Sequence, residues 1–171
     1  MRIAVLSDVH ANSSSLSIAL SKIEKLQVDK VVFLGDLLTY GCDVEQTIDL
    51  LSNFSISNDV SFVKGNHDEI YINMQAGLDY HYKPFPDFIE ESVTYTHRLL
   101  PSNFCDLFDW KESIVLKNIL FTHANGLTYG DWSYLNTDSE LIATATELRK
   151  TDFIGGVFGH THRPVFCEVK Q

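Results

Sequence analysis

The sequence has little cysteine, little positive charge and no long apolar run. Its three cysteines, Cys42, Cys105 and Cys167, are odd in number and far apart, which argues against a disulfide framework or a thiolate metal site. No apolar stretch approaches the roughly 20 residues that span a bilayer. The apolar start of the chain ends at Ser7-Asp8 and is too short for a signal peptide. We therefore expect a cytoplasmic protein whose cysteines are reduced.

The shortage of basic residues also limits the partners. The chain carries 13 Lys and Arg against 23 Asp and Glu, a net charge of -10. An acidic surface repels a phosphate backbone, so nucleic-acid binding is not expected. Carboxylates gathered in one site repel each other unless a metal ion neutralises them. With 171 residues, 44% of them hydrophobic, the chain fits one globular domain over residues 1–171.

Apolar segments in the first half alternate between strand and helix patterns. Such an order predicts parallel strands, and in parallel sheets ligands bind beyond the carboxyl ends of the strands. The predicted strands are Arg2–Leu6, Lys30–Leu34 and Val60–Val63, and the predicted helices run from residue 12 to Gln27 and from Val44 to Leu51.

The second half gives a weaker pattern. The region 71–108 is expected to contain a helix at Phe88–Leu100 and to form either a cap over the site or ordinary packing. Further on, we predict a hairpin of Glu112–Leu116 and Ile119–Thr122, a helix from Asp138 to Lys150, and strands at Phe153–Phe158 and Val165–Val169.

Residues of metal-ligand type follow the predicted strands. Each motif alone is weak, because polar turns and single histidines are common. Together they are specific, since five of the seven histidines fall directly after strands and would meet at one end of the layered sheets. A set of His, carboxylate and amide ligands without thiolates suits Mn, Fe, Zn, Co or Ni, and its size suits two ions. The motifs are Asp8-x-His10, Gly35-Asp36, Gly65-Asn66-His67-Asp68, Thr122-His123 and Gly159-His160-Thr161-His162.

In this order, these motifs resemble the calcineurin-like metallophosphoesterase pattern from Met1 to about Pro164. The segments Asp8–Asn12 and Gly35–Gly41 resemble its small bacterial and archaeal YfcE-like phosphodiesterase branch. The resemblance implies an α/β fold, a four-layer α/β/β/α sandwich of two mixed sheets. It also implies hydrolysis of a phosphoester by a hydroxide that bridges two divalent metal ions, with manganese favoured and Fe, Zn, Ni or Co as alternatives.

The resemblance further implies a role for each matching residue. His67 would assist the leaving group without binding metal, and Asp68 would orient His67 by accepting its other ring N–H. Asp36 would bridge the two ions. Asp8, His10 and His162 would hold one ion, and Asn66, His123 and His160 would hold the other.

Some features depart from the family pattern. Gly35-Asp36 is not followed by the Arg-Gly of protein phosphatases, and Tyr40-Gly41 stands there instead, which favours small phosphodiesters over phosphomonoesters. The chain has nine residues after His162, where the family usually adds strands to the second sheet. We therefore expect a second sheet that is incomplete at the C-terminus, with an exposed edge that a homodimer could cover.

Three alternatives stay open at this point. They are a phosphomonoesterase or protein phosphatase of the same fold, a non-catalytic metal-binding scaffold, and a nuclease, which the acidic charge disfavours. The aromatic residues Tyr129, Trp132 and Tyr134 follow His123. They either line the substrate cleft or pack as core.

Overall fold

The first sheet consists of four parallel strands in the order β1-β2-β3-β4. The computed structural model describes residues 1–78, 85–126 and 128–169. In the central strand pair of this sheet, residues 31–33 and 62–63 are buried, as expected for the apolar runs of a parallel sheet. The strands are β1 Ile3–Leu6, β2 Lys30–Phe33, β3 Val60–Val63 and β4 Trp110–Lys111.

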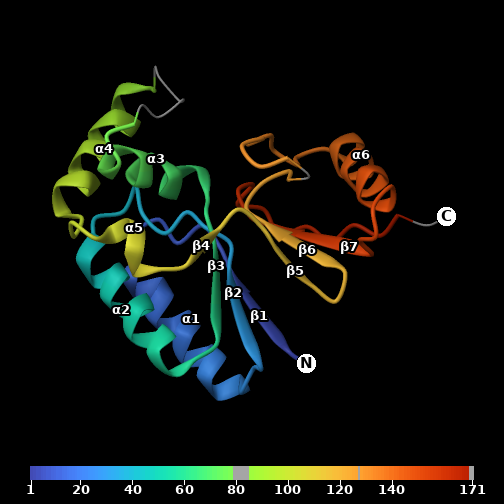
Figure 1. Ribbon diagram of the computed structural model, residues 1–171, viewed down its shortest axis with the longest axis horizontal. Helices are drawn as coiled ribbons and strands as arrows, with labels where there is room; N and C mark the ends of the chain where they lie inside the picture. The colour runs from blue at the N-terminus through green and yellow to red at the C-terminus, as the bar shows by residue number, and fades with distance from the viewer. Residues whose placement is uncertain (79–84, 127, 170–171) are drawn as a thin grey trace.

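Two amphipathic helices cover one face of this sheet (Figure 1). Helix α1, Ser13–Leu26, begins where the Asn12 side chain accepts a hydrogen bond from the Ser15 amide at 2.9 Å. Its buried residues, Leu16, Leu20 and Ile23, recur at helical spacing. Helix α2, Val44–Ser57, extends beyond the predicted end at Leu51 because Phe54 continues its buried face.

The region predicted as a cap or packing unit contains helices beside the same sheet. They are α3 Asn66–Gln75, α4 Asp87–Leu99 and α5 Phe104–Leu107. Tyr71, Val93 and Phe104 are buried and belong to the core cluster that also holds α1 and α2. The region therefore packs as part of the domain core. Residues 79–84 of the predicted cap lie outside the described residues.

The second sheet has three strands in the order β5-β6-β7. Strands β5, Ile114–Leu116, and β6, Ile119–Thr122, form the predicted hairpin, and β7, Gly155–Phe158, pairs with β6 in parallel. Helix α6, Asp138–Arg149, lies on the outer side of this sheet (Figure 1). The sheets face each other through an apolar layer that includes Val32, Val63 and Phe121.

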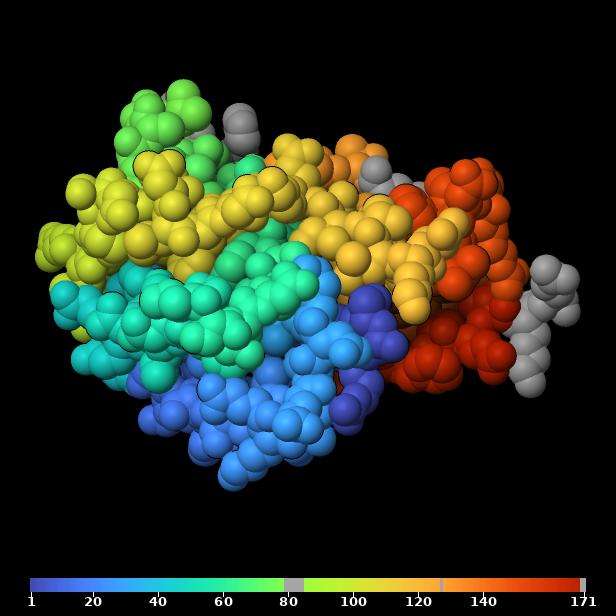
Figure 2. Space-filling view, turned by 60° about the horizontal axis from the view of Figure 1, so that its bottom comes forward, coloured from blue at the N-terminus to red at the C-terminus, as the bar shows by residue number. Residues whose placement is uncertain are grey.

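This arrangement confirms the predicted two-sheet α/β fold with helices on the outside. In the space-filling view the N-terminal segment, in blue, lies directly against the C-terminal segments, in red (Figure 2). Ile3 and Val157 belong to the same inter-sheet cluster, which agrees with that view. Among the described helices, none has the length and apolar character needed to cross a bilayer.

Several details differ from the sequence-based predictions. The second sheet is mixed, but the described part of the first sheet is parallel throughout. Val165–Val169 was predicted as a strand but is irregular, because no described strand pairs with it. Phe166 in that segment is 91% exposed. Helix α3 was not predicted, since its apolar residues, Ile70, Ile72 and Met74, do not form a clear helical pattern.

Candidate metal centre

The loops after β1 and β2 run side by side and position the first site residues. The amides of Asp8, His10 and Ala11 donate hydrogen bonds to the carbonyls of residues 35, 36 and 37 at 3.0, 3.0 and 2.8 Å. The pairing of the two strands thus continues into the loops. It fixes the side chains of Asp8 and His10 beside that of Asp36.

Glycine is needed where the loops after β2 and β3 approach each other. A Cβ atom on Gly35 would lie 2.2 Å from the amide nitrogen of Gly65, and Gly35 has a φ of +83°. A Cβ atom on Gly65 would lie 2.1 Å from Oδ1 of Asp36. The two glycines therefore let Asp36 lie at the N-terminus of α3, where the His67 amide donates to its Oδ1 at 2.9 Å.

Several site residues have left-handed backbone conformations although none of them is glycine. The φ angles are 54° at Asp8, 48° at His10, 57° at Asp36, 65° at His160 and 53° at His162. Such conformations are uncommon for non-glycine residues and persist where the surrounding structure holds them, often at functional sites. Ala11 has a φ of 52° and shares this conformation.

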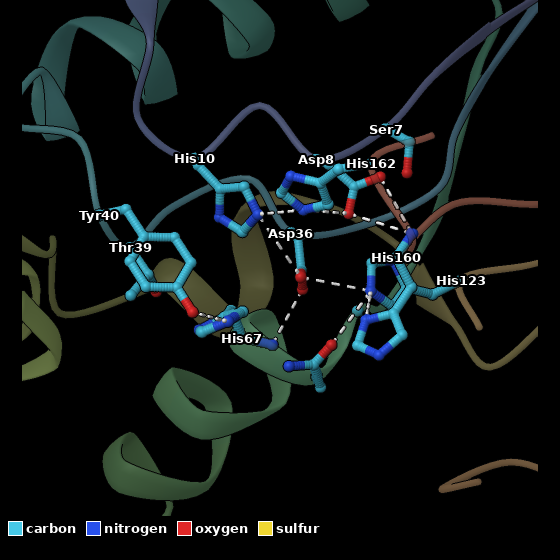
Figure 3. Close-up of polar contacts among 12 residues, drawn as sticks. Ser7, Asp8, His10, Asp36, Thr39, Tyr40, His67, His123, His160 and His162 are labelled. Atoms are coloured by element: carbon cyan, nitrogen blue, oxygen red, sulfur yellow. Dashed lines mark hydrogen bonds and ion pairs between the residues drawn. The ribbon is translucent and has the colours of Figure 1, made fainter. Parts of the chain in front are cut away.

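Asp8, His10 and His162 form the first group of candidate ligands (Figure 3). Nε2 of His10 lies 3.2 Å from Nε2 of His162, which lies 3.4 Å from Oδ1 of Asp8. Asp8 also accepts hydrogen bonds from the His160 amide, which ties the loop after β7 to the loop after β1. The His162 side chain is 54% exposed, so this group opens to solvent.

Asp36, His123 and His160 form the second group, and all three are buried. Nε2 of His123 lies 3.2 Å from Nδ1 of His160 and 3.1 Å from Oδ1 of Asn66. The amide oxygen of Asn66 is thereby placed as a fourth candidate ligand atom beside this group.

Asp36 lies between the two groups (Figure 3). Its Oδ2 is 3.3 Å from Nε2 of His123 and 3.8 Å from Nε2 of His10. Burial raises the pKa of Asp36, but the neighbouring imidazoles, with His123 the strongest, outweigh burial and hold the pKa well below its usual range. The Asp36 carboxylate is therefore charged and can serve as a ligand in both groups.

The histidine rings are oriented as metal ligands require. A backbone carbonyl can only accept a hydrogen bond, so the ring nitrogen facing it carries the proton and the other keeps its lone pair. Nδ1 of His10 faces the Leu38 carbonyl at 3.0 Å, and Nδ1 of His123 faces the Leu34 carbonyl at 2.5 Å. Nε2 of His160 faces the Trp132 carbonyl at 2.9 Å. With neutral rings, three lone pairs thus point inward, which fits divalent ions held by nitrogen and oxygen ligands.

His67 and Asp68 begin helix α3, and their contacts correct one expectation. Asp68 was predicted to accept a ring N–H of His67. Its carboxylate instead accepts the amides of Asp36, Leu37 and Gly65 at 2.7, 3.0 and 2.8 Å. A helix N-terminus turns the Asp68 side chain back toward the preceding loop, as in a capping box, so Asp68 braces the backbone of the site.

Burial dominates the protonation of both residues. It lowers the pKa of His67 to about 4, so the ring is neutral at pH 7. Burial and the nearby Asp36 charge raise the pKa of Asp68 to about 7, although the three backbone donors favour its charged form.

Two tyrosines and a tryptophan complete the surroundings of the site, and the list of predicted site residues did not include them. Tyr40 Oη lies 3.1 Å from Nε2 of His67. Tyr134 stacks on the ring of His160 at 4.3 Å between centroids, and Trp132 lies edge-on to His123 at 5.9 Å. Of the two interpretations of the aromatic loop after His123, the position beside the site holds for Trp132 and Tyr134. That loop was the sequence signal that pointed to these two residues, whereas Tyr40 stands in the loop after β2 and had no such signal.

Comparison with known proteins agrees with this geometry. The sequence profile of the calcineurin-like phosphoesterase superfamily domain matches residues 1–171. The chain belongs to this superfamily. The resemblance carried by the five motifs is therefore confirmed over the whole chain.

Individual relatives share only low sequence identity with this chain. The uncharacterized protein MJ0912 of Methanocaldococcus jannaschii is 28% identical over 141 residues, which are 80% of this chain and 54% of that protein. The hypothetical protein PH1004 of Pyrococcus horikoshii OT3 has a similar structure, with a TM-score of 0.78 and 20% identity, over 96% of this chain and 71% of that chain.

A metallophosphoesterase from Sphaerobacter thermophilus is similar with a TM-score of 0.66 and 24% identity, over 95% of this chain and 61% of that chain. These structural likenesses show the fold. The chain spans about half the length of the curated relative that it matches.

Proposed function

We propose that the protein is a metal-dependent phosphoester hydrolase that uses two divalent ions and prefers small phosphodiesters. The observation that carries this proposal is the position of Asp36, whose Oδ2 faces His123 at 3.3 Å and His10 at 3.8 Å. One buried carboxylate between two groups of inward-facing ligands suits a pair of ions that share it. Family membership supports the same chemistry.

Seven side chains would hold the ions, and they are the seven expected from the family resemblance. When bound, the ions would supply an activated water and stabilise the charged oxygens of the phosphoryl group. Manganese is the ion we favour, because the ligands are nitrogen and oxygen without sulfur. The ligands would be Asp8, His10 and His162 for one ion, Asn66, His123 and His160 for the other, and Asp36 for both.

The chain's own residues would position the substrate and assist its leaving group. His67 is 6% exposed and lies beside Asp36 at the N-terminus of α3. Its neutral ring would donate a hydrogen bond to the leaving oxygen as the bond between phosphorus and that oxygen breaks. Phosphate groups also favour a helix N-terminus such as that of α3.

The preference for diesters is supported by the lack of fixed positive charge. Within the described residues, no hydrogen bond or ion pair joins a site side chain to Lys or Arg. Arg163, next to His162, donates to the Asn136 carbonyl at 3.2 Å. A monoester carries one more negative charge than a diester and would benefit more from such a cation. We therefore propose diesters ahead of monoesters.

The experiment is a comparison of substrates with the full chain loaded with manganese. Hydrolysis of an aryl phosphodiester, exceeding that of the matching monoester, is the expected result. Asp36→Ala should abolish turnover and reduce the bound metal, measured by elemental analysis. Asp59→Ala, which removes an exposed carboxylate paired with Lys30 at 2.7 Å, is the control and should leave both unchanged.

Two other results would change or refute the proposed activity. Faster hydrolysis of the monoester would make the protein a phosphomonoesterase. Tight binding of metal without turnover on either substrate, with Mn, Fe, Co, Ni and Zn each tried, would favour a non-catalytic scaffold and refute the proposed activity. The cytoplasmic location and the homodimer stay predictions.

A further inference from the structure

His67 has one hydrogen-bond partner for its ring among the described residues. Nε2 lies 3.1 Å from the hydroxyl oxygen of Tyr40. Nδ1 is buried and has no partner in the described part of the chain. The predicted partner, Asp68, is occupied by three backbone amides. Tyr40 is therefore the polar group that determines how this ring is held.

The backbone of Tyr40 is fixed in an uncommon conformation. Tyr40 has a φ of 67°, and the preceding Thr39 has a φ of 76°, which is a clear outlier for a β-branched residue. The Thr39 hydroxyl hydrogen-bonds the buried Tyr71 hydroxyl at 2.6 Å, and the Tyr40 amide donates to Ser92 Oγ at 2.7 Å. Strain of this kind persists only where the surroundings hold it, and it concentrates at functional sites.

The ring of Tyr40 packs against the site as well as bonding to it. Its centroid lies 4.9 Å from the His67 ring, at 69°, and 4.8 Å from the His10 ring, at 59°. Figure 3 shows the hydroxyl of Tyr40 directed at His67. With 47% of its surface exposed, Tyr40 contacts the site on one side and solvent on the other.

The hydrogen bond also decides which ring nitrogen of His67 carries the proton. If Nδ1 carried it, a buried N–H would have no acceptor, which native structures seldom allow. If Nε2 carries it, the Tyr40 oxygen accepts a hydrogen bond from Nε2–H, and Nδ1 holds a lone pair instead of a proton. We propose that Tyr40 is the positioning residue of His67, which orients the ring and selects the tautomer with its proton on Nε2.

This arrangement prepares the ring of His67 to donate a hydrogen bond to the leaving oxygen. This part of the inference rests on the proposed function. The Nε2–H group points at Tyr40, whose ring packs on the ligand His10, so a leaving oxygen can take the place of the tyrosine oxygen as acceptor. The ring need not rotate or change tautomer when substrate binds. Such preorganised donors lower the cost of reaching the transition state.

The first test is spectroscopic and does not depend on activity. Two-bond ¹H–¹⁵N correlation spectra of the metal-free full chain report the tautomer of each histidine, and His67→Gln identifies the signals of His67. We expect the Nε2–H pattern in the parent protein and a shift toward a mixture of tautomers in Tyr40→Phe. Tyr95→Phe is the control, because the Tyr95 hydroxyl donates to the Cys42 carbonyl at 3.4 Å in the same loop.

The second test is kinetic and uses two diesters that differ in the leaving group. Tyr40→Phe should lower kcat about tenfold, the scale of one hydrogen bond, for an alkyl leaving group. For a nitrophenyl group, which leaves without help, the loss should be under about twofold, and KM should not change. Tyr40→Phe should add nothing to the loss in a His67→Gln background, because both changes remove one function.

Three results would overturn the inference. They are His67 signals that are identical in the parent protein and Tyr40→Phe, a parent protein with the proton on Nδ1, and a kinetic loss that is equal for both leaving groups or additive with His67→Gln. If the parent protein hydrolyses neither diester, the proposed function fails, and the spectra still decide the role of Tyr40.

Discussion

The Oδ2 atom of Asp36 lies 3.3 Å from Nε2 of His123, the ring nitrogen that would bind metal. Burial alone would lower the pKa of His123, but the Asp36 carboxylate, together with Asp8 and the Leu34 carbonyl, outweighs burial and raises it to about 9 in the metal-free protein. Below that pH, a proton therefore occupies the position that an ion needs. Metal binding and protonation compete for the same lone pair.

Metal binding should consequently release a proton from His123 at pH 7.5. Below pH 9 the affinity should fall about tenfold per pH unit for each proton displaced, and it should level off above pH 9. Calorimetric titration with zinc in two buffers of different ionisation enthalpy measures the protons released. Asp36→Asn removes the charge that holds the proton, so the release should fall. Equal heats in both buffers would contradict this prediction.

Asp68 should contribute strongly to stability through the three amides that it accepts. In Asp68→Asn, one carboxylate oxygen becomes an NH₂ group that faces a backbone N–H in a fully buried position. We expect a loss of about 1–3 kcal/mol in the free energy of unfolding, the cost of leaving a buried donor without an acceptor. Because the pKa of Asp68 is raised to about 7, its ionisation costs stability as the pH rises. Urea unfolding of the metal-free protein at pH 5, below the raised pKa, therefore measures the loss of the contacts.

Asp59→Asn is the matched control for this change, because Asp59 is exposed and pairs with Lys30 at the surface. Its effect on unfolding should be slight. A similar effect of the two substitutions would show that Asp68 does not brace the loops.

The sequence predicted the site better than it predicted the periphery of the fold. The strands β1, β2, β3, β6 and β7 are short, mainly apolar runs followed by polar residues, and this pattern is local. The rule that parallel strands present their carboxyl ends together then brings Asp8 and Asp36 to one place, and the packing of the two sheets brings His123 there. The convergence of the ligands follows from local pattern, sheet topology and sheet packing.

The failed predictions depend on contacts between distant segments. Val165–Val169 has the composition of a strand, but a strand also needs a neighbour, and none is present among the described residues. The partner of Asp68 was misassigned because the helix N-terminus turns its carboxylate toward Asp36 and Gly65. Tyr40 was missed because its link to His67 spans 27 residues and depends on the backbone turn at Thr39.

Gly65 should not tolerate a side chain, because the site loops approach closely there. The Cβ atom of Gly65→Ala would lie 2.1 Å from Oδ1 and 2.6 Å from the amide nitrogen of Asp36. The loops must separate, which should cost about 1–3 kcal/mol of stability and weaken metal binding at Asp36. Gly155→Ala is the control, since a Cβ at Gly155 meets no atom within 4 Å. Melting temperature and bound metal measure both effects, and an equal response of the two variants would refute the prediction.

The two ions should bind with different affinities, because the two ligand groups differ in how firmly they are held. His123 and His160 are buried and each donates a hydrogen bond to a carbonyl, so they lose little freedom on binding. The His162 side chain is 54% exposed and must be ordered when an ion binds, which costs about 0.5–1.5 kcal/mol, or up to about tenfold in affinity. A graded titration with chelator should remove the ion beside Asp8 first. His162→Ala should weaken only this step, whereas His160→Ala should weaken the other. Elemental analysis after each chelator concentration follows the loss, and simultaneous release of both ions from the parent protein would show that the groups do not differ in this way.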